Sequence, residues 1–103
     1  MPVAVHPDSE FARAVFLVMA AIPPGRVASY GAVARQAGFP RHSRFVGKLM
    51  AFVPRNGKLP WWRIIRADGR SGMSGAAAER QYARLRAEGV VILGGRVDMR
   101  RFA

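Results

Sequence analysis

Residues 29–53 read SYGAVARQAGFPRHSRFVGKLMAFV, and this stretch decides the predicted fold. It opens with Ser29, a residue type whose side-chain oxygen commonly caps a helix by accepting from a backbone N–H group. The pattern predicts a short helix over 30–37 that stops at Gly38, since glycine readily takes the left-handed conformation found after helices. The Phe-Pro pair at 39–40 then forms a turn.

A second helix is predicted from about Arg41 or His42 to Pro54, which interrupts it because proline lacks the backbone N–H group that a helix needs. Apolar residues recur on one side of this helix at helical spacing, which marks the buried face. They are Val46, Leu49 or Met50, and Val53. Two short helices joined by a turn with glycine and proline are typical of a helix-turn-helix, whose second helix usually enters a groove of DNA.

The flanking sequence predicts a domain that is mostly α-helical with short strands. A helix over 9–22, capped by Asp8, precedes the helix-turn-helix and ends at the Pro-Pro-Gly sequence of residues 23–25. The other expected elements are an extended segment at 26–28, a buried strand entered through 60–65, a small-residue loop at 67–75, a helix over 76–88 that buries Ala78, Tyr82 and Leu85, and a hairpin over 90–99. A length of 103 residues fits one domain spanning 1–103.

The charge pattern points to a polyanionic partner. Seventeen Lys and Arg residues face six Asp and Glu residues, which gives a net charge of +11. Ten of the basic residues and only one acid lie between Arg26 and Arg70, so +9 of the charge falls in this segment. Fifteen of the seventeen are Arg, whose planar guanidinium suits phosphate contacts and base stacking. Nucleic acid is the favoured partner, and a merely solvated basic surface is the alternative.

The sequence argues against several kinds of chemistry. It has no cysteine, which excludes disulfides, Cys-based zinc sites and thiolate nucleophiles. His6 and His42 lie far apart without carboxylates at ligand spacing, so we expect no metal and no cofactor. The longest apolar run has nine residues, far short of the roughly 20 that a membrane-spanning helix needs. We therefore expect a cytoplasmic protein without membrane contact, associated with the nucleoid if it is bacterial.

Basic and aromatic side chains are the main candidates for function. Arg41, Arg44 and Lys48 are spaced to share an exposed face at the start of the second helix of the motif. For Arg44 the alternative is an ion pair, but no carboxylate stands near it in the sequence. Tyr30 could be an ordinary core ring. The Trp pair at 61–62 could likewise be core, or one ring could form a wall for an unstacked base beside the small-residue loop.

These segments together resemble the DNA-binding domain of the O6-alkylguanine-DNA alkyltransferases, from Phe11 to about Met99. The matching pieces are IPPGRV at 22–27, SYG at 29–31, GFP at 38–40, SRFVG at 43–47, PWWRII at 60–65, Gly69, and Glu88-Gly89. The resemblance implies a winged helix-turn-helix fold. It also implies that Tyr30 helps to rotate the target nucleotide out of the duplex and that Arg44 fills the space left in the stack.

The sequence departs from this family at the reactive centre. Where the family has Pro-Cys-His-Arg, with the cysteine accepting the alkyl group, this chain has Pro-Trp-Trp-Arg at 60–63. Val53 replaces the asparagine usual on the recognition helix, and only Glu88 remains of the associated hydrogen-bonded network. An indole carbon is not comparable to a thiolate as a nucleophile, so direct alkyl transfer is chemically implausible and we expect no enzyme activity.

Tryptophan at the cysteine position is the pattern of the alkyltransferase-like proteins, which this chain resembles. The resemblance implies a monomeric damage sensor that flips O6-alkylguanine in double-stranded DNA, bends the duplex, leaves the alkyl group in place and directs the lesion to nucleotide excision repair proteins. The inserted side chain would kink the duplex, and the small cost of flipping a weakened base pair would favour the lesion.

These observations assign expected roles to individual residues. Tyr30 and Arg44 flip the nucleotide and insert into the DNA stack. The expected lesion pocket consists of Trp61, Val53, Trp62, Ile64, Met73 and Ser74. The expected contacts to the DNA backbone are Ser29, Arg26, Arg35, Arg41, Lys48 and Arg63, with support of the pocket strand as the alternative role for Arg63.

Two other classes of function remain open at this point. A winged-helix regulator would use the same basic face without preferring a lesion, and it would favour a defined sequence instead. An alkyltransferase with an unorthodox acceptor would gain the mass of the alkyl group after meeting methylated DNA.

Overall fold

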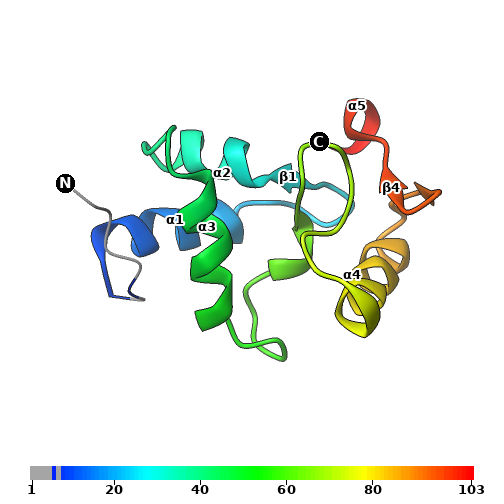
Figure 1. The fold of residues 1–103 in the computed structure, drawn as a ribbon, viewed down its shortest axis with the longest axis horizontal. Helices are drawn as coiled ribbons and strands as arrows, with labels where there is room; N and C mark the ends of the chain where they lie inside the picture. The colour runs from blue at the N-terminus through cyan, green and yellow to red at the C-terminus, as the bar shows by residue number, and fades with distance from the viewer. Residues whose placement is uncertain (1–5, 7) are drawn as a thin grey trace.

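The computed structural model describes residue 6 and residues 8–103, and the fold is mostly helical with short strands, as the sequence predicts (Figure 1). The elements in chain order are helix α1 (Glu10–Ala20), strand β1 (Ala28–Ser29), helices α2 (Tyr30–Gln36) and α3 (Ser43–Leu49), 3₁₀ helices η1 (Met50–Phe52) and η2 (Trp61–Arg63), strand β2 (Ile64–Ile65), helix α4 (Gly75–Ala87), strands β3 (Ile92–Leu93) and β4 (Arg96–Val97), and helix α5 (Met99–Phe102).

Helix α1 is shorter than predicted and has a different cap. The Ser9 hydroxyl, rather than Asp8, accepts the capping hydrogen bond from the backbone N–H of Ala12 at 3.0 Å. The helix ends at Ala20, two residues before the predicted end, yet Ile22 is still buried. The predicted helix is therefore present, and the error concerns only its ends, where capping geometry decides.

Helices α2 and α3 form the predicted pair. The Ser29 hydroxyl caps α2 by accepting from the N–H of Ala32 at 3.0 Å, and Gly38 follows α2 with φ of 90°. Helix α3 begins at Ser43, later than predicted, and continues into η1 instead of remaining α-helical up to Pro54. Its predicted apolar face is correct, since Val46, Leu49, Met50 and Val53 are all buried.

A short parallel pairing joins the start of α2 to the tryptophan segment. Strand β1 pairs with β2 so that Ala28 faces Ile64 and Ser29 faces Ile65. The residues that precede β2 form the 3₁₀ turn η2, and the chain then enters the predicted buried strand at Ile64. The pairing places Tyr30, the first residue of α2, and the η2 turn at nearby points of the fold.

The buried side chains form two clusters. The first packs α1, α2, α3 and η2 together, and the second packs α4 against the hairpin of β3 and β4 and against α5. Helix α5 is absent from the sequence prediction: the expected strand over 96–99 ends at Val97, and Asp98 then caps α5 by accepting from the N–H of Arg100. Trp62 and Met73 touch both clusters and so lie where the two halves of the domain meet.

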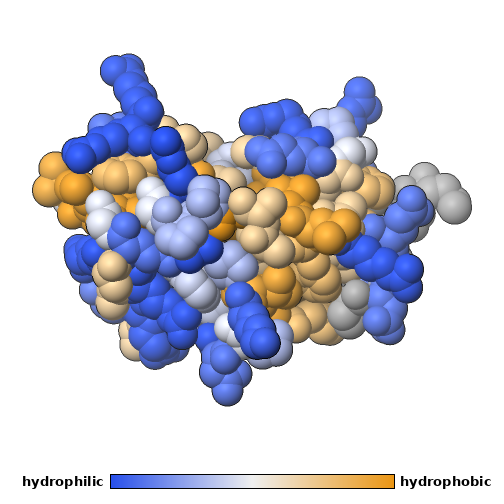
Figure 2. Space-filling view, turned by 180° about the vertical axis from the view of Figure 1, so that it is seen from behind, coloured by the Kyte–Doolittle hydropathy of each residue, from blue (hydrophilic) through white to orange (hydrophobic). Residues whose placement is uncertain are grey.

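The surface is basic with local apolar areas. Seen from behind, apolar side chains gather near the middle of the molecule and over α1, while hydrophilic side chains project around them (Figure 2). Leu17 of α1 is 74% exposed, and Leu93 at the hairpin is 75% exposed. Among the helices that the structure describes, none combines the length and the apolar composition needed to cross a membrane.

Gly69 provides a test of how the loop after β2 docks on the hairpin. Its φ is +84°, and a Cβ at this position would overlap the backbone oxygen of Val97. We expect Gly69→Ala to lower the free energy of unfolding by about 3 kcal/mol or more, because strained backbone and an unavoidable clash add together. Gly94→Ala is the matched control: its φ is +59° but nothing lies near its Cβ, so about 1 kcal/mol should be lost. Urea unfolding measures both, and equal losses would contradict the proposed contact.

Candidate nucleic-acid interface

A cavity of about 660 Å³ opens between α3, η1, η2 and the loop that follows β2. Figure 1 shows α3 and this loop on either side of the region where η2 lies. The cavity is lined by Tyr30, Ser43, Arg44, Gly47, Lys48, Met50, Ala51, Arg55, Trp61, Ile64, Arg66, Gly72, Met73 and Gln81. Apolar walls with a few polar groups at the edge and a volume within roughly 300–1,000 Å³ are typical of small-ligand sites.

Tyr30 stands at one side of this cavity, where α2 begins. Its hydroxyl lies against the backbone of Gly72, at a spot that a Cβ on residue 72 would occupy. Burial raises the pKa of Tyr30 above its ordinary value of 10.0, although the charges of Arg55 and Arg66 act to lower it. The phenol is therefore protonated at neutral pH and can donate a hydrogen bond.

Arg44 is exposed on α3 and lines the same cavity. Among the described residues, 6 and 8–103, three ion pairs occur, and Arg44 belongs to none of them. The ion-pair alternative raised from the sequence therefore finds no support. Lys48, one turn later, also lines the cavity, and its Nζ lies 5.5 Å from the ring centre of Phe45. Arg41 is exposed but precedes α3, which corrects its predicted place in the first turn of that helix.

Trp61 forms a rigid wall of the cavity. The side chain is almost completely buried, and its indole N–H donates to the backbone oxygen of Arg55 at 3.0 Å. The ring meets Trp62 edge to face with centres 5.9 Å apart, and the guanidinium of Arg55, which also lines the cavity, lies 4.7 Å from the centre of the Trp61 ring. Hydrogen bonding and packing thus fix the orientation of the indole, which presents carbon rather than a nucleophilic atom.

Only part of the predicted pocket lines the cavity. Trp61, Ile64 and Met73 do, whereas Val53, Trp62 and Ser74 do not. Val53 is buried in the core because the chain turns from α3 into η1, which brings Met50 and Ala51 to the cavity in its place. Ser74 is the exposed residue before α4, and Trp62 points to a different set of partners.

A buried amide holds the cavity loop in place, and the sequence analysis missed it. Gln81 on α4 donates to the backbone oxygens of Trp62, at 3.1 Å, and Ile64, at 2.7 Å, and its own side-chain oxygen accepts from the Ser71 hydroxyl at 2.5 Å. The Ser71 hydroxyl in turn accepts from the N–H of Met73 at 3.0 Å. A signal for this role existed, because Gln81 shares the buried helical face of Ala78, Tyr82 and Leu85.

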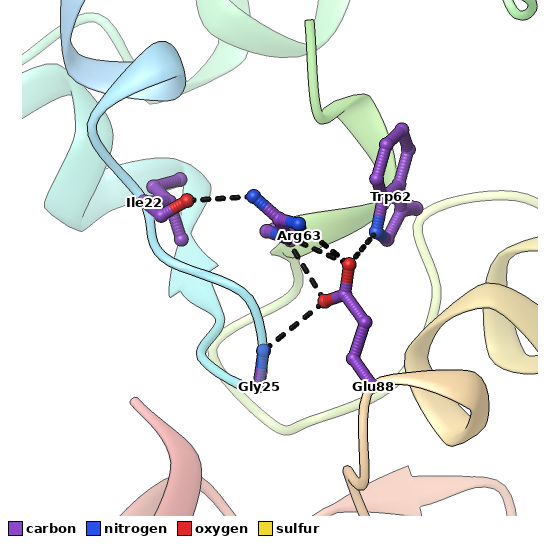
Figure 3. Close-up of polar contacts among 5 residues, drawn as sticks. All are labelled: Ile22, Gly25, Trp62, Arg63 and Glu88. Atoms are coloured by element: carbon purple, nitrogen blue, oxygen red, sulfur yellow. Dashed lines mark hydrogen bonds and ion pairs between the residues drawn. The ribbon is translucent and has the colours of Figure 1, made fainter. Parts of the chain in front are cut away.

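Glu88 joins three segments of the chain through hydrogen bonds (Figure 3). It accepts from the Trp62 indole N–H at 3.0 Å, from the backbone N–H of Gly25 at 3.2 Å and from the Arg63 guanidinium at distances down to 2.6 Å. Arg63 also donates to the backbone oxygen of Ile22 at 2.8 Å. With its side chain only 12% exposed, Arg63 is committed to this network, which favours support of the pocket strand over the predicted DNA contact.

The other predicted backbone contacts are spread over the surface. Arg35 is exposed on α2, and Ser29 uses its hydroxyl to cap that helix. Arg26 is exposed and donates to the backbone oxygen of Arg101 at 3.1 Å, away from the cavity. Arg55 and Arg66, which line the cavity, were not predicted. They lie in loops, where no periodicity distinguishes a functional arginine from a solvated one.

No group of three or more metal-ligating side chains occurs within the described residues, 6 and 8–103. The His42 ring instead packs among aromatic rings, with centres 5.6 Å from Phe39, 6.0 Å from Phe11 and 5.4 Å from Phe45.

Comparisons with known proteins agree with this architecture. The family model for the 6-O-methylguanine DNA methyltransferase DNA-binding domain matches residues 10–90. A DNA base-flipping protein of Vibrio parahaemolyticus is 36% identical over 90% of this chain and 94% of its own length. Alkyltransferase-like protein 1 of Schizosaccharomyces pombe is 36% identical over 81% of this chain and 79% of its own.

Solved structures give the same result. The S. pombe Atl1 complex with damaged DNA containing O6-carboxymethylguanine has a TM-score of 0.75 and 36% identity, covering 82% of this chain and 80% of that one. The Mycobacterium tuberculosis OGT complex with DNA has a TM-score of 0.71 and 32% identity, covering 79% of this chain and 49% of that one. The match to both shows the same fold in proteins crystallised with DNA.

The Glu88 network makes a prediction about stability. Burial alone would raise the pKa of the Glu88 carboxyl, but hydrogen bonds from Arg63, Trp62 and Gly25 and the Arg63 charge lower it below its ordinary value of 4.5. The stabilisation is therefore present above the unfolded-state pKa and is lost as the pH falls through the lower folded-state pKa. We expect Glu88→Gln to lower the free energy of unfolding by about 2 to 3 kcal/mol at pH 7 and to flatten its fall between roughly pH 5 and 3.

Glu79→Gln supplies the control, because Glu79 is exposed on the same helix. It should change the free energy of unfolding by less than about 0.5 kcal/mol. Denaturant titrations at several pH values measure all three proteins. An unchanged pH profile in Glu88→Gln would show that the carboxylate does not contribute in this way.

Proposed function

The chain belongs to the family defined by the DNA-binding domain of 6-O-methylguanine DNA methyltransferase, and we propose from this that it binds O6-alkylguanine in duplex DNA by flipping the nucleotide, without removing the alkyl group. The observation that carries the proposal is Trp61: an indole forms the cavity wall where the sequence motif of the alkyltransferases has the acceptor cysteine.

Binding to DNA is supported by the position of the cavity beside α3. Arg44 and Lys48 stand at its edge, free to approach a duplex whose backbone is negatively charged. The net charge of +11 strengthens this attraction without giving sequence preference. Arg44 would enter the stack in place of the flipped nucleotide, and the inserted side chain would kink the duplex.

Holding the flipped base is supported by the shape of the cavity. Tyr30 stands at one side and Trp61 at another, with Ile64 and Met73 adding apolar contact. Stacking of a base on an aromatic ring contributes about 1 to 3 kcal/mol, comparable to the few kcal/mol that flipping costs. An alkylated guanine already pairs poorly, so the same contacts would favour the lesion over an intact base.

Retention of the alkyl group follows from the chemistry of the site. Transfer requires a nucleophile to displace guanine at the alkyl carbon, and the family uses a thiolate for this step. The chain contains no cysteine, and the Trp61 N–H is already donated to a backbone oxygen. Relatives named for base flipping support the proposal, among them the DNA base-flipping protein of Escherichia coli, which is 38% identical over 92% of this chain.

A protein that marks a lesion without repairing it needs a partner that completes the repair. The kinked, occupied site would present that partner with a distorted duplex, and we propose that nucleotide excision repair proteins respond to it. In this scheme the chain acts as a monomer, because one flipped nucleotide occupies one cavity. It would act on DNA in the cytoplasm.

A competition experiment tests the function directly. Matched duplexes with guanine or O6-methylguanine should differ in affinity by at least tenfold in favour of the lesion, at two salt concentrations, since phosphate contacts weaken equally for both duplexes as salt rises. Intact-mass spectrometry of the same mixtures should show no added methyl group. Equal affinities would favour the lesion-independent regulator, and an added 14 Da would favour an enzyme with another acceptor.

Arg44 and Arg41 should separate insertion from general attraction. Arg44→Ala should weaken lesion binding about tenfold more than it weakens binding to undamaged duplex, because Arg44, unlike Arg41, lines the cavity. Arg41→Ala removes the same charge from an exposed position before α3 and should weaken both duplexes to a similar extent. Fluorescence anisotropy measures the four affinities. The insertion role would be refuted by parallel losses in the two variants.

A further inference from the structure

The charged side chains that line the cavity all carry the same sign. They are Arg44, Lys48, Arg55 and Arg66, and within the part of the chain that the structure describes no Asp or Glu lines the cavity. The first two lie on α3, whereas Arg55 and Arg66 come from the loops after η1 and β2. All four side chains are exposed, and the charges of Arg55 and Arg66 both act on the Tyr30 phenol. The cavity thus has a positive rim that an uncharged guanine derivative does not require.

Arg66 and Arg55 differ in how much of their charge is available. Arg66 pairs with Asp68 at 3.1 Å, which offsets part of its attraction for another anion. Arg55 takes part in none of the ion pairs within the described residues. Its charge is therefore the less compensated of the two.

Arg55 is also held close to the wall on which a base would rest. Its backbone oxygen accepts from the Trp61 indole, and its guanidinium lies 4.7 Å from the centre of the same ring. A base in contact with Trp61 would therefore bring its O6 substituent within reach of the Arg55 side chain. A guanidinium forms its strongest contacts with carboxylates, through paired and charged hydrogen bonds.

We propose that Arg55 makes the cavity prefer O6-alkylguanines whose substituent carries a carboxylate over neutral substituents of the same shape. The inference rests on the proposed function, since it concerns the lesion held in that cavity. The carboxymethyl group and its amide, the carbamoylmethyl group, differ by one charge and hardly in size. Arg55 is then a specificity-determining residue. Trp61, against which Arg55 packs, sets the distance between the Arg55 guanidinium and the bound lesion.

The test measures the affinities of duplexes with guanine, O6-methylguanine, O6-carboxymethylguanine and O6-carbamoylmethylguanine. The wild-type protein should bind the carboxymethyl duplex about five to twentyfold more tightly than the carbamoylmethyl duplex. Arg55→Gln should bring this ratio to within about twofold. The substitution keeps the backbone oxygen that holds Trp61, so the wall itself should remain. Arg55→Lys keeps the charge and should retain most of the ratio, and a complete loss there would overturn the assignment to charge.

Arg84→Gln is the matched control for charge and packing. The Arg84 guanidinium lies 5.6 Å from the ring centre of Trp61 and 4.4 Å from that of Trp62, and it makes a long contact of 3.5 Å with the Arg55 backbone oxygen, which Trp61 holds independently at 3.0 Å. Arg84 does not line the cavity. This variant loses the same charge beside the same indoles and should keep the wild-type ratio. A ratio that falls equally in Arg84→Gln and Arg55→Gln would overturn the inference, because the effect would then come from overall charge.

The outcomes also separate this inference from the proposed function. If the wild-type protein prefers O6-methylguanine to guanine but treats the two matched substituents alike, only the inference fails. If it binds all four duplexes equally, the proposed function fails as well. If Arg55→Gln weakens all four duplexes by one common factor, Arg55 contacts a phosphate and the assigned role is overturned.

Discussion

The arrangement of the domain depends on one ion pair in a nearly dry position. Glu88 follows α4, Arg63 ends the turn that carries both tryptophans, and Gly25 precedes β1, so one carboxylate joins three distant segments. A charge removed from water in this way is tolerated only when it is paired and hydrogen-bonded, as Glu88 is. This carboxylate holds the segment that carries the cavity wall in a fixed position.

The cavity is formed without the cysteine that the alkyltransferase motif carries. The helix pair, the small-residue loop and the apolar walls depend on packing and backbone geometry, and none of them needs a thiol. A large, well-fixed ring fills the position at which the alkyltransferase motif has its cysteine, so no thiolate nucleophile stands there. Under the proposed function, recognition of the lesion would rest on the cavity walls, and transfer would lack its nucleophile.

Local chemistry explains most of what the sequence predicts correctly. Ser29 and Gly38 mark the ends of α2 because capping acts over three or four residues. The later start of α3 and the place of Val53 could not be predicted, since the packing of His42 among aromatic rings and the tighter turn of η1 are tertiary effects. The partnership of Glu88 with Arg63 spans 25 residues of chain, and Arg55 sits in a loop, so neither gives a periodic signal.

The pairing of β1 with β2 is only two residues long, yet it sets Tyr30 relative to the tryptophan turn. A slip by one residue would move one segment along the other by about 3.3 Å and turn its side chains to the opposite face. An insertion or deletion between Val27 and Tyr30, or between Arg63 and Ile65, would therefore disrupt the site even if every functional side chain were kept. The length of these two stretches is thus as strong a requirement of the site as the identity of the side chains within them.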